Sequence, residues 1–385
     1  MRRSIACSVL VPPFLWLTLA VILFACSQQS NAPSSSESLN APNTDQPDNL
    51  GVSATEFGKF RKKIYVENNL ILNDKLKYLP DKFRRNAVLI DGNRMYSNNK
   101  QLLDEMEQYT QLNGTNGTAW IDEKGQRRQM AGFTQSSTSL KDNFSTQATN
   151  IDCATDNSGP FSRVLAHPGY SWFKGIVNLP GTSEARQYPG DSIHMYTGGW
   201  SSSAAVDGGF QRNDDGRYQA ILRAAFNGFS GYAISTPHHF LAGSGNLEFF
   251  TEPDNTVWLS ATGYWEEEGY IDTVTLGFTS VPGFNAQGDG VQLRFTTSVA
   301  QPNGEEPYRF KDGSFVDTFW SKLWLGNYSD QNGWSGHQWM ANSNDIEEVC
   351  NSPSSQTYFN DSSYWNSVFS GWQDDEVYQI NIDLQ

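Results

Sequence analysis

Four polar residues stand out because their spacing would place them together on one face of a β-hairpin. Asp207 and Gln211 alternate with small and apolar residues, and Gln219 and Arg223 do the same in the next stretch. This period of two is typical of strands with one buried face. If the turn centres on Asp215, Asp207 lies opposite Arg223 and Gln211 opposite Gln219. The row would form either a ligand-binding floor on a concave sheet or a salt bridge on a solvated sheet face.

The hairpin that carries this row spans residues 196–228. Asp215-Gly216 supplies residues that tolerate positive φ at the turn. Small residues crowd both strands, which indicates that another part of the chain approaches them closely. We therefore expect this hairpin to form the floor of a β-sandwich.

Aromatic residues gather near the C-terminus, in segments that also contain Asn, Gln, Asp and His. Trp334 and Trp339 flank His337 in the clearest example. Indole rings stack on the C–H faces of sugars, while amides and carboxylates bind sugar hydroxyls. Trp334, Trp339, Trp365 and Trp372 are therefore candidate glycan contacts. The alternative is that they fill the core of a large sandwich, as Trp residues often do.

Carboxylates are the second group that could carry chemistry, because glycoside hydrolysis needs two of them about 5 Å or about 6.5–9.5 Å apart. Glu248 and Glu252 share one stretch, but the central Asp of a laminarinase-type E-x-D-x-x-E motif is missing. Glu266–Glu268 is typical of a solvated loop. A hydrolase or lyase that uses these Glu residues or Asp207 stays an alternative, and we do not favour an enzyme.

No sequence motif predicts a cofactor. The adjacent His238 and His239 would point to opposite sides of an extended chain, which makes them a poor metal pair. The sequence contains no H-E-x-x-H, C-x-x-C, G-x-S-x-G, P-loop or EF-hand pattern. We predict no metal site. The oxygen-rich turns Asn213–Gly216 and Gly288–Gly290 could hold Ca²⁺ but would serve equally well as turns.

Residues 115–385 are predicted to form a mainly β domain, a double-sheet sandwich of the jelly-roll kind, because short alternating stretches are separated by turn signals. Outside the hairpin, the expected strands cover residues 170–179, 192–196, 246–250, 256–264, 271–281, 291–299, 318–325 and 377–384.

Residues 51–114 are predicted to form a small helical segment. Its clearest helix begins at Asn99, a helix-capping residue, and has Leu102, Leu103 and Met106 at helical spacing. Packing against the sandwich is the usual meaning of such an apolar stripe.

Residues 1–25 have the order of an export signal: two Arg residues, an apolar run and small residues. The ending L-F-A-C resembles the bacterial lipobox, which implies that Cys26 is lipidated and that the protein is held at the outer membrane or cell surface. An ordinary secretory signal is the alternative. Residues 26–50 contain no aromatic residue, Lys or Arg, so we expect a disordered tether.

Charge and cysteines restrict the partners and the compartment. Residues 111–385 contain 14 Lys and Arg against 31 Asp and Glu, and the whole chain carries a net charge of −15. Such a body repels nucleic acid and anionic headgroups, so we expect no nucleic acid partner and membrane contact through the lipid anchor only. Cys153 and Cys350 are expected to form a disulfide in an exported chain; two buried thiols are the alternative.

Three segments share a strand order with a known family. They are Ser203-Ala-Ala-Val-Asp207, Tyr218-Gln-Ala-Ile-Leu-Arg223 and Asn255-Thr-Val-Trp-Leu-Ser-Ala-Thr262, and together they resemble the glutamic peptidases, or eqolisins. The resemblance implies a concanavalin A-like β-sandwich. It places Ser203 and Arg223 where that family has its catalytic Gln and Glu. Because a guanidinium cannot act as an acid or base near neutral pH, the resemblance supports the sandwich and not the peptidase activity.

The sequence therefore predicts a lipid-anchored envelope protein whose β-sandwich binds a glycan or an envelope polymer. A glycoside hydrolase or lyase on the same fold is the second hypothesis, and a structural envelope protein without a small ligand is the third. A fold alone does not choose among them. The residues expected to bind the ligand are Asp207, Gln211, Gln219, Arg223, Trp334 and Trp339.

Overall fold

The residues that the structure describes all belong to one compact unit, Val52–Gln385. The computed structural model describes residues 62–65, 70–92, 94–106, 111–112, 119–121, 127–129, 160–226, 229–235, 239–265, 269–300, 313–352 and 367–384. The export signal, Cys26 and the tether lie outside the described residues, as do Glu266–Glu268 and Trp365. Cys350 is buried, but its expected partner Cys153 also lies outside them, so the disulfide stays a prediction.

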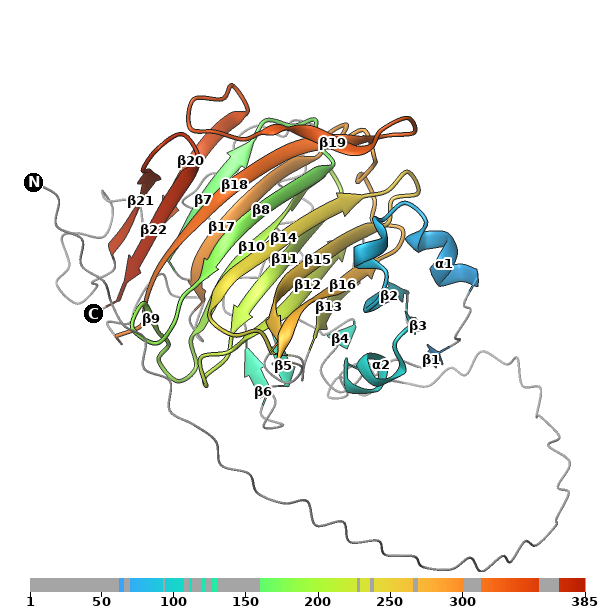
Figure 1. Ribbon diagram of the computed structural model, residues 1–385, viewed down its shortest axis with the longest axis horizontal. Coiled ribbons are helices and arrows are strands. Elements are labelled where there is room, and N and C mark those ends of the chain that lie inside the picture. Colours follow the sequence, from blue (N-terminus) through green and yellow to red (C-terminus); the bar gives the residue numbers. More distant parts are fainter. Residues whose placement is uncertain are drawn as a thin grey trace, which may run out of the picture. The chain divides into compact units, whose positions relative to one another are not determined.

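The described residues form two large β-sheets and one small one (Figure 1). The 12-stranded sheet has the order β1 (Lys62–Tyr65), β3 (Arg94–Ser97), β2 (Ala87–Asp91), β16 (Tyr270–Phe278), β15 (Val257–Trp265), β14 (Gly243–Thr251), β8 (Trp172–Leu179), β18 (Phe315–Ser329), β22 (Val377–Asp383) and β21 (Ser367–Trp372), with β19 (Gly333–Gln338) and β9 (Ala185–Arg186) also paired to β18.

The 8-stranded sheet has the order β20 (Ile346–Ser352), β7 (Phe161–Ala166), β17 (Gln292–Ala300), β10 (Ser192–Trp200), β11 (Ala204–Arg212), β12 (Tyr218–Phe226), β13 (Phe229–Ile234) and β4 (Gln111–Leu112). Strands β5 (Ala119–Ile121) and β6 (Arg127–Gln129) form a separate hairpin. The eight strands expected outside the hairpin of residues 196–228 are all present as β8, β10, β14, β15, β16, β17, β18 and β22.

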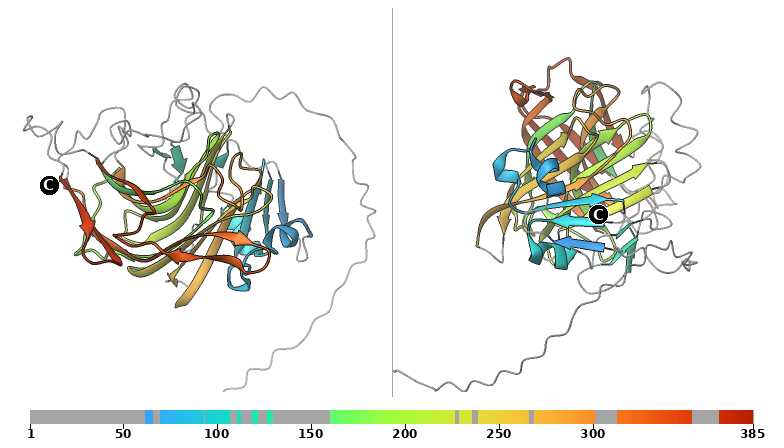
Figure 2. Two further views of the ribbon diagram at one scale, coloured as in Figure 1. Left: turned by 90° about the horizontal axis from the view of Figure 1, so that it is seen from above. Right: turned by 90° about the vertical axis from the view of Figure 1, so that its right-hand side faces the viewer.

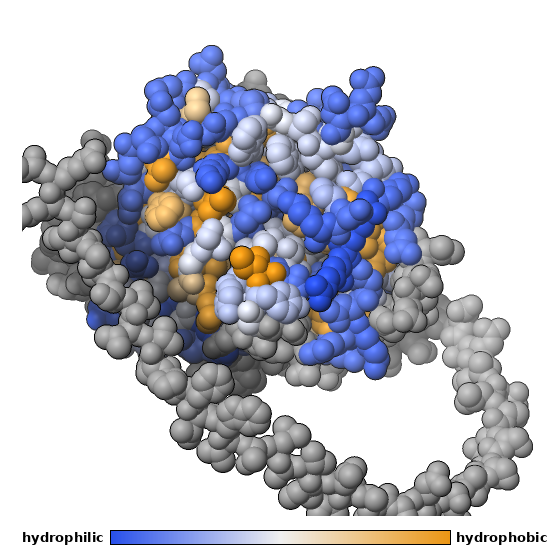
Figure 3. Space-filling view, in the orientation of Figure 1, coloured by the Kyte–Doolittle hydropathy of each residue, from blue (hydrophilic) through white to orange (hydrophobic). Residues whose placement is uncertain are grey.

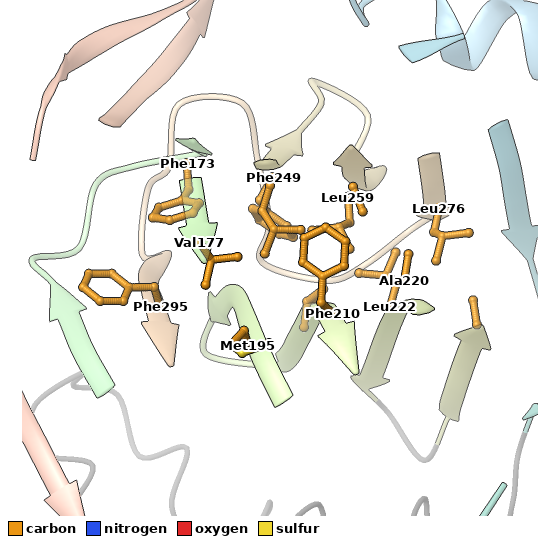
Figure 4. Packing of buried hydrophobic residues seen from close by; sticks show 14 of the residues in the cluster. Phe173, Val177, Met195, Phe210, Ala220, Leu222, Phe249, Leu259, Leu276 and Phe295 are labelled. Carbon is orange, nitrogen blue, oxygen red and sulfur yellow. The ribbon is translucent and has the colours of Figure 1, made fainter. Parts of the chain in front are cut away.

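The two large sheets lie face to face (Figure 2) and enclose the main core. In Figure 4, side chains from β8, β14, β15 and β16 point toward side chains from β10, β11, β12 and β17. This arrangement follows from the alternation in each strand, since every second residue is apolar and turns inward. The described part of the chain is thus mainly β and sandwich-like, as the sequence predicted.

Phe295 of β17 holds the two sheets together at one end of the core. Its ring centroid lies 5.2 Å from that of Trp320, 5.2 Å from that of Trp339 and 5.5 Å from that of Tyr378. All four side chains are fully buried. A hydrogen bond also joins the two sheets here: Trp320 Nε1 of β18 donates to Thr297 Oγ1 of β17 at 3.1 Å.

The segment expected to be helical contains strands as well as helices. Helix α1 (Leu70–Leu76), the 3₁₀ turn η1 (Asp81–Phe83) and helix α2 (Lys100–Met106) are separated by β2 and β3, and β2 pairs in parallel with β16. The helix expected after Asn99 is present, with Asn99 Oδ1 accepting from the Leu102 amide at 3.1 Å. The sequence did not predict β2, because Ala87–Ile90 is a short run of buried residues without alternation. Such a run does not distinguish a strand from a helix.

The surface in Figure 3 shows hydrophobic residues in separate small patches among hydrophilic ones. The exposed large hydrophobic side chains of the described residues are Tyr188, Tyr264, Tyr270, Ile271, Phe319, Trp324 and Val349. No helix among the described residues is long and apolar enough to cross a membrane.

The role of Phe295 predicts a large loss of stability when its ring is removed. We expect Phe295→Ala to lower the free energy of unfolding by about 3–5 kcal/mol, because the change leaves a cavity between the sheets. Phe319→Ala is the matched control, since Phe319 is 36% exposed, and should cost less than about 1 kcal/mol. Denaturant titration measures both changes, and equal losses would contradict this role for Phe295.

Candidate ligand-binding site

The polar row predicted from the hairpin is present in the expected register. Asp207 lies opposite Arg223 and Gln211 opposite Gln219 across the β11–β12 pair. The residues that precede them on β11, Val206 and Phe210, belong to the main core. Strand alternation therefore turns the row to the other side of the 8-stranded sheet, away from the core.

We call this side of the sheet the polar face. It also receives side chains from β7, β10 and β17, whose pairing places them next to the hairpin. Most of these side chains are buried, whereas Trp200, Ala205 and Arg223 are half-buried and border one end. The main residues of the polar face are Arg163, His194, Tyr196, Trp200, Asp207, Gln211, Gln219, Arg223, Gln292, Arg294 and Thr296.

The ion pair on the polar face joins Asp207 to Arg294, which lies two strands away. Nη2 of Arg294 donates to Asp207 Oδ1, and the two side chains are 3% and 7% exposed. Gly198 occupies the position between them on β10. Its φ of +135° favours glycine, and an added Cβ would collide with the Val206 carbonyl oxygen of β11. Sequence patterns alone could not find this partner, because β17 and β11 are distant in the chain.

Aromatic rings pack against the guanidinium groups of Arg163 on β7 and Arg294 on β17. The Arg294 guanidinium carbon lies 3.4 Å from the centroid of the Trp200 ring, a stacking distance. Arg163 lies over Phe161 at 4.4 Å, and its Nε donates to Thr296 Oγ1 at 3.3 Å. Burial lowers the pKa of Arg294; Asp207 acts in the opposite direction and Arg163 in the same direction as burial. An arginine stays protonated under these conditions, so a fixed positive charge lies within the polar face.

His194 continues the row of amides across the sheet. It pairs with Gln211 in the β10–β11 register, so Gln219, Gln211 and His194 lie in line on three neighbouring strands. The ring is fully buried, and its Nε2 lies 3.3 Å from Ser192 Oγ. Burial lowers the pKa of His194 to about 4. The imidazole is therefore neutral at pH 7 and offers one donor and one acceptor.

The low pKa of His194 predicts acid sensitivity. The unfolded chain takes up a proton near pH 6.5, whereas the folded chain does so near pH 4. Stability should therefore fall as the pH drops from about 6.5 to 4, by about 2 kcal/mol at pH 5 from this residue. His194→Gln removes the titration and should flatten this part of the curve, measured by denaturant unfolding at a series of pH values. An unchanged slope would contradict the assignment.

The two tryptophans expected to bind the ligand lie elsewhere. Trp339 is fully buried in the main core against Phe295, which is the alternative the sequence left open. Trp334 packs on a second cluster with Phe250, and its Nε1 donates to the Tyr78 carbonyl at 3.2 Å. The structure does not bring either indole to the polar face. A different tryptophan, the half-buried Trp200, lies on the polar face. The sequence placed Trp200 in the hairpin region but did not identify it as a candidate ligand contact.

The candidate catalytic carboxylates are not brought together on the polar face. Glu248 lies on the outer side of the 12-stranded sheet and contacts Lys82 at 3.0 Å and Lys174 at 3.8 Å. On the polar face, Asp207 is paired with Arg294, and Glu348 of β20 lies four strands away, about 19 Å between backbones. This separation exceeds that of a glycosidase pair. The described residues also contain no group of three or more His, Cys, Asp or Glu side chains that could hold a metal ion.

Glu252 follows β14 and is fully buried beside α1 and Trp258. Burial raises its pKa to about 9, so the carboxyl group is neutral at pH 7. Trp258 opposes this shift, but burial outweighs it. This site is enclosed and separate from the polar face.

The raised pKa of Glu252 predicts the opposite pH dependence from that of His194. Between about pH 4.5 and 9 the unfolded chain releases the proton while the folded chain keeps it, so stability falls as the pH rises through this range. Glu252→Gln should raise stability by about 3 kcal/mol at pH 7, measured by denaturant unfolding.

Glu248→Gln, on β14 just before Glu252, is the matched control. The Glu248 carboxylate is paired with two lysines, so its replacement should not stabilise the protein. A gain for both variants, or for neither, would contradict the prediction for Glu252.

By sequence, the chain matches no family model and no curated protein. Among solved structures it is similar to Scytalido-glutamic peptidase bound to a peptide-based transition state analog, with a TM-score of 0.36 and 11% identity over 58% of this chain and 97% of that chain. It is also similar to SCP-B, a member of the eqolisin family, in complex with the tripeptide Ala-Ile-His, with a TM-score of 0.37 and the same identity and coverage. The sequence resemblance pointed to the same family.

Proposed function

We propose that this chain is a lipid-anchored protein of the bacterial envelope whose polar face binds a glycan or another envelope polymer. In this proposal the two sheets form a concanavalin A-like jelly-roll, Cys26 carries the lipid, and residues 26–50 connect it to the sandwich. The face-to-face packing of two large sheets and the signal-like N-terminus support these expectations.

The observation that carries the proposal is the line of Gln219, Gln211 and His194 across three strands. Sugar hydroxyls both donate and accept hydrogen bonds, and so do two amides and a neutral imidazole. Aromatic side chains, Tyr196 and Trp200, lie on the same strand as His194 and supply apolar surface. Such a combination of few polar groups with aromatic surface is common in sites for small polar molecules.

Access to this line begins at the half-buried end of the polar face, formed by Trp200, Ala205 and Arg223. The amides themselves are only 3–4% exposed. Binding of a glycan therefore requires that these side chains become accessible from that end. The hydrolase or lyase alternative has less support, because the carboxylates of the polar face are paired or far apart.

A pull-down tests the proposal. The full-length chain should sediment with at least one insoluble or envelope polysaccharide without releasing soluble sugar. Gln219→Leu removes one amide from the line and should weaken retention about ten-fold, as expected for a lost hydrogen-bonding group. Gln287→Leu makes the same change on an exposed loop and should leave retention unchanged.

The other outcomes separate the alternatives. Released oligosaccharide would indicate a hydrolase or lyase. Neither retention nor release on any polymer of the panel would contradict glycan binding and favour a structural envelope protein.

A further inference from the structure

Arg294 is the most unusual side chain of the polar face. It is 3% exposed, and of its guanidinium nitrogens only Nη2 has an acceptor, the Asp207 carboxylate. Nε and Nη1 are buried and have no hydrogen-bond partner in the described structure. Donors of this kind are costly to leave unmatched, particularly on a charged group. The arrangement therefore leaves unused hydrogen-bonding capacity for a negatively charged or strongly accepting group.

The surroundings of Arg294 restrict the shape of that group. Its guanidinium is stacked on the Trp200 ring at 3.4 Å, and the sheet lies beneath it at Gly198. Its N–H bonds point outward in the plane of the guanidinium. A planar carboxylate can lie in that plane and accept from it. The oxygens of a tetrahedral sulfate or phosphate would project out of the plane toward the ring or the sheet.

Charge favours a carboxylate as well. Within β10, β11, β12 and β17, the polar face has two cations, Arg223 and Arg294, and one anion, Asp207. The register places Arg223, Asp207, Gly198 and Arg294 in one line across four neighbouring strands, so both cations lie at the same level of the sheet. The chain as a whole carries −15, and a monovalent carboxylate is repelled less by this field than a phosphate dianion.

We propose that the polar face binds an acidic saccharide, and that Arg294 accepts the carboxylate of a uronic acid residue. This inference rests on the proposed glycan-binding function and specifies its ligand class. Asp207 positions the guanidinium through Nη2. The amides of Gln211 and Gln219 lie on the same face and would contact the hydroxyls of neighbouring sugars.

The test compares polymers that differ only in their carboxylates. The full-length chain should be retained by immobilised polygalacturonate about ten- to a hundred-fold more strongly than by its fully methyl-esterified form, because the ester removes the charge that pairs with Arg294. Dextran sulfate serves as an anionic polymer without carboxylates and should be retained weakly.

A double variant tests whether Arg294 causes the preference for the acid, and a surface arginine variant is its control. Arg294→Gln alone leaves Asp207 buried without its partner, which endangers folding. The double variant Asp207→Asn with Arg294→Gln removes both charges and should bind the acid and the ester equally. Arg217→Gln, which removes an arginine from the exposed turn where it pairs with Asp215, should keep the preference for the acid.

Each remaining outcome overturns the inference in a different way. Equal retention of acid and ester by the unmodified chain would contradict carboxylate recognition and leave glycan binding intact. Equal retention of polygalacturonate and dextran sulfate would indicate general anion binding. A preference for the acid that survives in the double variant would exclude Arg294 as its cause, and no retention on any polymer would contradict both the inference and the proposed function.

Discussion

The alternation of β17 is the constraint on which both the core and the candidate site depend. Phe295 turns inward and contacts three aromatic rings of the opposite side of the sandwich. Arg294, the preceding residue, turns outward and reaches Asp207 across Gly198. A one-residue slip of this strand would move the guanidinium into the core and the phenyl ring onto the polar face. The packing of the core therefore fixes the register that places the guanidinium on the polar face.

Two buried ionisable groups of this protein lose their charge. Burial is the largest cause of the pKa shifts of His194 and Glu252, and both are neutral at pH 7. Arg294 cannot lose its proton in the same way, and it is buried together with Asp207. Burial is thus relieved by neutralisation at His194 and Glu252 and by pairing at Arg294. This explains how an acidic chain keeps a positive charge inside a sheet.

The sequence predicted local relationships well and distant ones poorly. Alternation and the turn at Asp215 were sufficient for the Asp207–Arg223 register, because both strands belong to one hairpin. The partner Arg294 could not be inferred, since strand order across β10 is set by packing between distant segments. The role of Trp339 was ambiguous in the sequence, because its neighbours in the chain are polar although its ring is buried in the core. Burial, and not residue type, decides whether an aromatic side chain is available to a ligand.

The parallel pairing of β2 with β16 determines when the protein can complete its structure. Asp91, at the end of β2, bonds to Thr279, which is 188 residues later in the chain. The N-terminal strands emerge first during synthesis but have no sheet to join until β16 has also emerged. Closing so long a loop carries an entropic cost before any contact repays it. The edge of the 12-stranded sheet therefore assembles late, after most of the chain has been synthesised.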